Sequence, residues 1–231
     1  MSQHTVKAFD QDIAQLRGLI SEMGGRAIAA ITGAITALIK SDLDAARTII
    51  ADDKKIDALE SEVETLAVRI IALRAPMADD LREVIAALKI AGTIERMGDY
   101  AKNIAKRIEV IGSARQIEAV SLLPAMGNIV VEMVHDVLDA YAARDATKAL
   151  AVSNRDKPVD DFYSSIFHAL VAFMMENPKS ISGAAHLLFV AKNLERIGDH
   201  ATNVAEMVYY AASGVQMAER EKGAEAIAIK V

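Results

Sequence analysis

The sequence predicts an all-α protein of two tandem three-helix bundles, six long helices in all, related by internal pseudo-twofold symmetry. Hydrophobic residues make up 52% of the 231 residues but aromatic residues only 4%, which is typical of helical cores built from small and aliphatic side chains. Only 12 Gly and 4 Pro interrupt the chain, so long helices with short connections are expected. An internal repeat of about 100 residues makes each half one helical unit.

The first half, residues 7–111, contains apolar positions with a helical spacing near 3.6. Asp42 is placed to cap the second helix, because its side chain can accept a bond from a free backbone amide. Pro76 stops that helix, and Asp79 or Asp80 is a candidate cap for the third, which ends before Gly112 and Ser113. The three helices are expected at about residues 7–39, 43–74 and 79–111.

The second half, residues 116–214, repeats this pattern. Pro124 lies early in its first helix, and Asp145 is placed to cap the next one. Asn177 and Pro178 are typical of a cap followed by a first helical turn. The helices are expected to end near Arg144, at Glu176 and before Gly214, and residues 215–231 are expected to form a loosely attached tail.

The repeat is strongest between residues 88–105 and 188–205, where nine of eighteen positions are identical at an offset of 100. Earlier in each half the offset is 103, which aligns the Met-Gly pair at 23–24 with the pair at 126–127. Each half is therefore expected to have the same three-helix structure.

A column of polar residues lies on one face of the last helix of each half. Residues four apart stack on one helix face, and two ionised carboxylates stacked in this way repel each other. Because burying an unpaired carboxylate costs several kcal/mol, such a column needs cations, protons or solvent beside it. The columns are Glu95, Asp99 and Asn103 in the first half and Glu195, Asp199 and Asn203 in the second.

The preceding helix of each half carries a matching acidic pair, Asp53 with Asp57 and Asp156 with Asp160. Because a short loop joins the two helices, they should lie antiparallel, with four carboxylates converging. Converging carboxylates on facing helices are how helical bundles build sites for hard cations. These carboxylates are the candidate metal ligands, and iron, zinc, manganese or magnesium fits such oxygen donors. No organic cofactor is expected.

Adjacent basic residues leave a simpler alternative open, in which the acids form a solvated ion-pair network. The repetition of both acids with Gly98 and Gly198 favours an ion site, because a glycine inside a helix suggests close helix approach or room for a ligand. Arg155 precedes the second acidic pair where the first half has Asp52, so the two sites are expected to differ.

Other features exclude several classes of protein. The net charge of −6 disfavours nucleic-acid binding, and the lack of cysteine removes disulfides and thiolate chemistry. Nucleotide-binding and acyl-transfer motifs are not found, so no enzymatic activity is expected. Glu132 and His135 form one EXXH pair, whereas di-iron bundles need two. The chain has no evident secretory signal and is placed in the cytoplasm.

The motifs ERMGDYAKN at 95–103 and ERIGDHATN at 195–203, with DKKID, DKPVD and the two Met-Gly pairs, resemble the PhoU family of phosphate-transport regulators. The resemblance covers about residues 7–214. It implies two three-helix bundles, frequent homodimers, and metal clusters on the acidic columns of some members. Carried over to this sequence, the resemblance adds Asn103 and Asn203 to the candidate metal ligands of the two halves.

The resemblance also implies a cytoplasmic negative regulator of the phosphate regulon. Such a protein couples the ATPase subunit of the high-affinity phosphate ABC transporter to a sensor histidine kinase, contributes to phosphate homeostasis, and meets the membrane only through these partners. The alternative function is a carboxylate-bridged metal protein with redox or storage activity.

Overall fold

The computed structural model describes residues 2–111 and 117–218. Every regular element in these ranges is helical, which confirms the predicted fold class. The predicted break at Gly112 and Ser113 and residues 219–231 of the predicted tail lie outside these ranges. The long helices are α1 (Ser2–Lys40), α2 (Leu43–Arg74), α3 (Asp79–Ile111), α4 (Leu123–Ala143), α6 (Asp156–Glu176) and α7 (Ile181–Ser213), joined by a short α5 (Ala146–Ser153) and by 3-10 turns at Glu118–Leu122 and Pro178–Ser180.

Two helix starts follow the predicted capping chemistry. The Asp42 carboxylate accepts a hydrogen bond of 2.9 Å from the amide of Ala45 at the start of α2. The Asp145 carboxylate accepts one of 2.9 Å from the amide of Lys148 at the start of α5. These aspartates lie 103 residues apart, so the repeat preserves the cap that begins the second helix of each half.

Three predicted details are wrong. Asp79 and Asp80 lie inside the first turn of α3 rather than before it, where carboxylates interact favourably with the helix dipole. Asn177 does not cap the last helix; its side-chain amide donates to the carbonyl of Phe173 in the preceding helix, and α7 begins only at Ile181. The helix expected over residues 146–176 is divided into α5 and α6 at residues 154–155.

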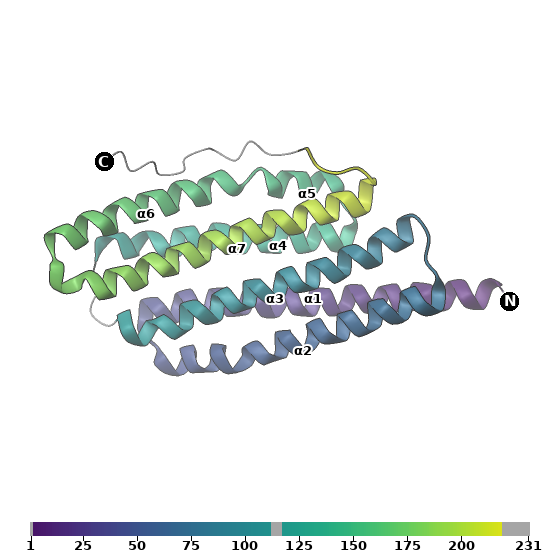
Figure 1. Ribbon diagram of the computed structural model, residues 1–231, viewed down its shortest axis with the longest axis horizontal. Helices are drawn as coiled ribbons and strands as arrows, with labels where there is room; N and C mark the ends of the chain where they lie inside the picture. Colours follow the sequence, from purple (N-terminus) through teal and green to yellow (C-terminus); the bar gives the residue numbers. More distant parts are fainter. Residues whose placement is uncertain (1, 112–116, 219–231) are drawn as a thin grey trace.

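The central helices α3 and α7 lie side by side, as Figure 1 shows. α2 flanks α3, while α5 and α6 flank α7. α1 and α4 contact each other and pack behind the two central helices (Figure 1). The described helices that carry the acidic residues therefore make one broad layer, and α1 with α4 forms the second.

Reciprocal contacts reveal the internal pseudo-twofold symmetry. A Cβ built on Gly24 of α1 would lie 2.3 Å from a Leu138 methyl carbon of α4, and one built on Gly127 of α4 would lie 2.2 Å from the Ile35 Cδ1 of α1. Gly24 and Gly127 are equivalent in the repeat, as are Ile35 and Leu138. The two Met-Gly pairs thus allow α1 and α4 to cross closely.

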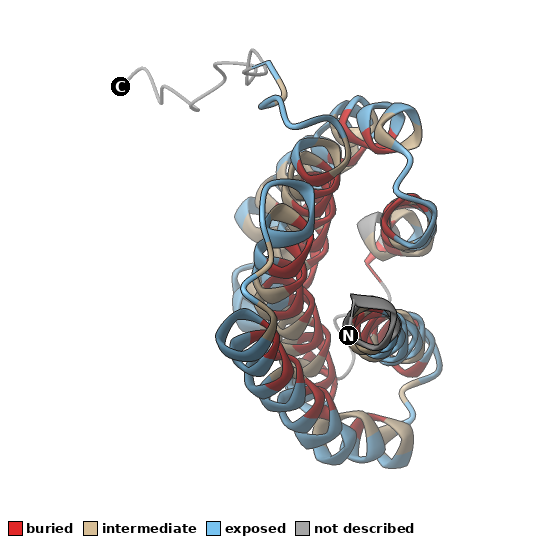
Figure 2. Ribbon diagram, turned by 90° about the vertical axis from the view of Figure 1, so that its right-hand side faces the viewer, coloured by how far each residue is buried: buried red, intermediate tan, exposed pale blue. Residues whose placement is uncertain are grey.

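Buried residues face inward between the two layers, and exposed residues cover the outer surfaces (Figure 2). By length and composition, two helical stretches are long and apolar enough to cross a membrane: Ala8–Lys40, within α1, and Val120–Ala143, which includes α4. The core helix of a bundle passes the same test, and Leu16 and Met133 are fully buried here. These windows are therefore weak evidence for a membrane span.

Candidate functional site

The predicted acidic residues of the first half converge between α2 and α3. We call Asp53, Asp57, Glu60, Glu95 and Asp99 the first acidic cluster. Asp53 is buried at 7% exposure, whereas Asp57 is exposed. The expected meeting of the two helices is confirmed, because one lysine contacts a carboxylate on each of them.

That lysine is Lys102, which lies on α3 one turn beyond Asp99. Its Nζ donates to Asp53 Oδ2 and, at 2.5 Å, to Asp99 Oδ1. Burial alone lowers the pKa of Lys102, but the hydrogen bonds and charges of Asp53 and Asp99 outweigh it and raise the pKa. The ammonium group is therefore a fixed positive charge at one end of the cluster.

The other end of the first acidic cluster carries crowded negative charge. Burial, followed by the charges of Asp99, Glu60 and Asp57, raises the pKa of Glu95 from its ordinary 4.5 to about 7, although Arg96 lowers it. Burial and neighbouring Glu64 and Asp57 also raise the pKa of Glu60. A carboxyl group in this position favours either a proton or an added cation.

The second acidic cluster consists of Asp156, Asp160, Glu195 and Asp199 on α6 and α7. Lys192 Nζ donates to Glu195 Oε1 at 2.6 Å and lies 5.0 Å from the centre of the Tyr163 ring. Glu195 Oε2 is buried and accepts no hydrogen bond from the described part of the chain. Burial is the main cause that raises the pKa of Glu195, and the charges of Asp199 and Asp160 add to it against Lys192.

Of the two glycine positions of the repeat, Gly98 marks the predicted close helix approach, whereas a Cβ on Gly198 would make only an ordinary van der Waals contact. A Cβ on Gly98 would lie 2.8 Å from Ile56 Cδ1 and 3.7 Å from Asp53 Oδ1. A Cβ on Gly198 would lie 3.4 Å from Val159. The α2–α3 contact is therefore tighter than the α6–α7 contact, so the two clusters differ in packing as well as in charge.

The predicted ligands do not form a closed coordination shell. Among the described residues, only His135, Asp136 and Asp139 bring three donor atoms of acidic or histidine side chains within 4.8 Å of one another. Asn103 and Asn203 are half-buried one turn beyond Asp99 and Asp199. The donors of both clusters are nonetheless oxygen atoms on facing helices, which suits hard cations.

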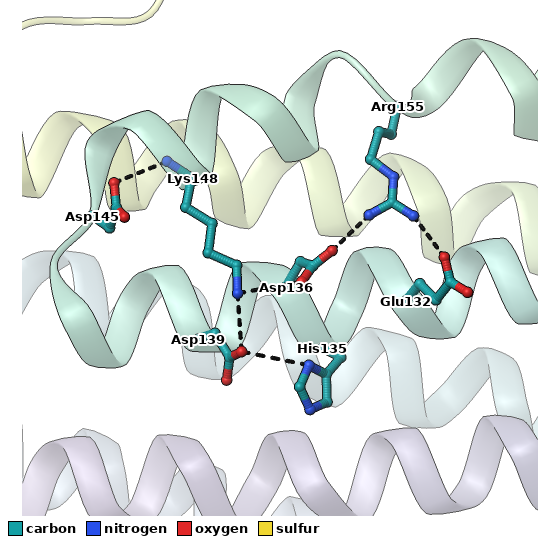
Figure 3. A network of polar contacts seen from close by, with 7 residues as sticks. All are labelled: Glu132, His135, Asp136, Asp139, Asp145, Lys148 and Arg155. Atoms are coloured by element: carbon teal, nitrogen blue, oxygen red, sulfur yellow. Dashed lines mark hydrogen bonds and ion pairs between the residues drawn. The ribbon is translucent and has the colours of Figure 1, made fainter.

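The histidine group belongs to an ion-pair network on α4 (Figure 3). Lys148 Nζ lies 2.9 Å from Asp139 and 3.3 Å from Asp136, so an ammonium group already neutralises these carboxylates. Arg155 lies 2.6 Å from Asp136 and 2.8 Å from Glu132. His135 is exposed and lies 3.6 Å from Asp139. Through Lys148 and Arg155, the network links α5 and the α5–α6 junction to α4 (Figure 3).

Between the two clusters, where α3 packs against α7, residues at equivalent positions of the repeat contact each other. The rings of Tyr100 and His200 stack with centres 5.5 Å apart. Burial lowers the pKa of His200; Asp199 opposes this, while Arg96 and Arg196 add to it. His200 therefore lies as a neutral aromatic ring where the halves meet.

Sequence reasoning missed Lys102, Lys192 and Glu60 as members of the clusters. Lys102 lies three residues after Asp99 and Lys192 three before Glu195, so both were within reach on the same helix face. Glu60 follows Asp57 by three residues. This spacing was the available signal, although many exposed side chains share it.

Comparison with protein families gives a match across both halves. The model described as the PhoU domain matches residues 20–108 and again residues 123–208. The two matched segments include every residue of the two acidic clusters.

Individual proteins agree with this match. The chain is 57% identical to the phosphate-specific transport system accessory protein PhoU homolog of Zymomonas mobilis, over 97% of this chain and 95% of that protein. It is 44% identical to the homolog of Caulobacter vibrioides, over 94% and 95%. The crystal structure of PhoU from Pseudomonas aeruginosa superposes with a TM-score of 0.86 at 35% identity, covering 90% of this chain and all of that one.

Proposed function

The chain belongs to the PhoU family, and from this premise we propose that it is a negative regulator of the phosphate regulon. It acts as an adaptor that couples the ATPase subunit of a high-affinity phosphate ABC transporter to a sensor histidine kinase in the cytoplasm. The observation that carries the proposal is the near full-length similarity to accessory proteins of phosphate-specific transport systems.

Proximity crosslinking in living cells tests the adaptor role. We expect a tagged copy of the chain to crosslink to the transporter ATPase subunit and to the kinase when phosphate is plentiful, and less strongly to the kinase when it is scarce. A tagged cytoplasmic protein of similar acidity is the control. Recovery of neither partner under either condition would overturn the proposal.

We further propose that iron, zinc, manganese or magnesium binds the two acidic clusters. The ligands would be Asp53, Asp57, Glu95, Asp99 and Asn103 in the first half and Asp156, Asp160, Glu195, Asp199 and Asn203 in the second. Two observations support the fit: the buried Glu195 Oε2 accepts no hydrogen bond from the described residues, and burial together with the neighbouring carboxylates raises the pKa of Glu95 to about 7. A bound cation would supply the positive charge that favours ionised carboxylates.

Metal analysis of gently purified protein tests this second proposal. The comparison variant combines Glu95→Gln, Asp99→Asn, Glu195→Gln and Asp199→Asn, which keep side-chain size but remove four negative charges. We expect metal to copurify with the wild type and not with the variant, and equal negligible metal in both would contradict the proposal. Oxygen consumption by the iron-loaded wild type would favour the redox alternative.

A further inference from the structure

Lys102 places its own cation among the candidate metal ligands of the first half. Its ammonium group contacts Asp53 on α2 and Asp99 on α3 at the same time. The Asp53 side chain is only 6% exposed and that of Lys102 only 22% exposed, so solvent screens the contact poorly. The lysine is thus held by carboxylates from two helices rather than lying loosely on the surface.

The second half has no lysine at the equivalent position. Thr202 replaces Lys102 there, and its hydroxyl donates to the backbone carbonyl of Asp199 at 2.7 Å. The lysine that contacts the second acidic cluster is Lys192, which pairs with Glu195 and occupies the position of Gly92 in the repeat. The repeat therefore conserves the acids but moves the basic residue from one end of the cluster to the other.

We propose that Lys102 is a tethered cation that competes with divalent metal ions for Asp53 and Asp99 in the first acidic cluster. This inference rests on the proposed metal binding and deepens it. An ammonium group is a compact charge with three donors, and it uses the same carboxylate oxygens that a metal ion would use. A metal ion entering this cluster must displace it, so the lysine sets the metal concentration at which the first half loads.

Calorimetric titration of the metal-free protein with Mn²⁺ at neutral pH tests the competition. Lys102→Thr copies the residue of the second half, and Lys106→Thr removes the same charge from an exposed site one turn further along α3. We expect Lys102→Thr to bind Mn²⁺ at least about ten-fold more tightly at one site, because the ammonium group no longer competes at contact distance for the same carboxylate oxygens. Lys106→Thr should stay within about two-fold of the wild type, because exposed charges are screened.

A thermal readout gives an independent check. Without metal, Lys102→Thr should melt below the wild type, because Asp53 keeps a buried charge without its partner. Saturating Mn²⁺ should raise its melting temperature more than that of the wild type. If Lys102→Thr folds poorly, Lys102→Gln keeps an amide donor while removing the charge. Adding Asp53→Asn to either variant should remove the gain in affinity, which assigns it to this cluster.

The outcomes separate the two proposals. Unchanged Mn²⁺ affinity in Lys102→Thr and Lys102→Gln, with binding by the wild type, overturns the competition and leaves the metal sites standing. No Mn²⁺ binding by the wild type or by either variant overturns both. Neither result bears on crosslinking to the transporter and kinase, which tests the regulatory role separately.

Discussion

Replacing Glu95 by glutamine should stabilise the metal-free protein at alkaline pH. Burial and the charges of Asp99, Glu60 and Asp57 raise the pKa of Glu95 from 4.5 to about 7 in the folded state. The stability that protonated Glu95 provides is fully present below its unfolded pKa and is lost as the pH rises through about 7. Wild type therefore loses stability between these values, and Glu95→Gln does not.

The size of the effect follows from the same shift. At ~1.4 kcal/mol per pH unit, the difference between 4.5 and about 7 corresponds to roughly 3 kcal/mol. Because Glu95 is only half-buried, solvent screening reduces this to about 1 kcal/mol. For a chain of this length, that difference raises the melting temperature by about 2–4 °C.

Thermal unfolding in the presence of a chelator, followed by circular dichroism at pH 4.5 and pH 8, measures the difference. Glu95→Gln and wild type should melt together at the lower pH and diverge at the higher one. The control is Glu109→Gln, which makes the same change at an exposed site on α3 and should shift little at either pH. A Glu95→Gln variant that melts below wild type at pH 8 would contradict this prediction, since it would show that the ionised carboxylate is stabilising.

Three further predictions concern stability and are checked by urea unfolding. Gly24→Ala should lower the free energy of unfolding by about 1–3 kcal/mol, because its Cβ would lie 2.3 Å from a methyl carbon of Leu138. Gly25→Ala, whose Cβ would have no neighbour within 4 Å, should raise it by up to about 1 kcal/mol. Equal effects of the two variants would contradict the close crossing of α1 and α4. Glu83→Gln should lower the free energy of unfolding by about 1–3 kcal/mol, because the buried Glu83 carboxylate pairs with Arg17 and Arg144. Glu22→Gln, which breaks the exposed ion pair with Arg26, should lower it by less than about 0.5 kcal/mol. Asp145→Ala should lower the free energy of unfolding by about 1 kcal/mol, because it removes the side-chain cap of α5. An unchanged free energy of unfolding would show that the cap is dispensable.

Local signals predicted the fold well where the sequence determines structure within one helical turn. The Asp42 and Asp145 caps are examples, because each side chain bonds an amide three residues ahead. The break between α5 and α6 was missed although Pro158 is a local signal for it, because a proline has no amide to bond the carbonyl of residue 154 and fits only the first turn of a helix, here the one that begins at Asp156. Arg155 at this junction also pairs with Asp136 and Glu132 of α4, nineteen and twenty-three residues earlier. Local sequence spacing does not predict that pairing.

The acidic clusters were predicted from residues four apart, and the structure brings the two helices together as expected. The sequence did not show that Asp53 is buried while Asp57 is exposed, since both belong to the same acidic pair. It also did not distinguish Lys102 from other lysines near acids. That distinction needs the crossing of α2 and α3, which places Asp53 against a lysine 49 residues away.

A reporter of the phosphate-starvation response measures whether the chain restrains phosphate signalling in the cell. The gene is deleted and the reporter is measured in phosphate-rich medium, with and without a plasmid copy of the wild-type chain. We expect strong reporter expression in the deletion strain and return to the repressed level on complementation. Reporter expression that stays at the repressed level in the deletion strain would contradict the account.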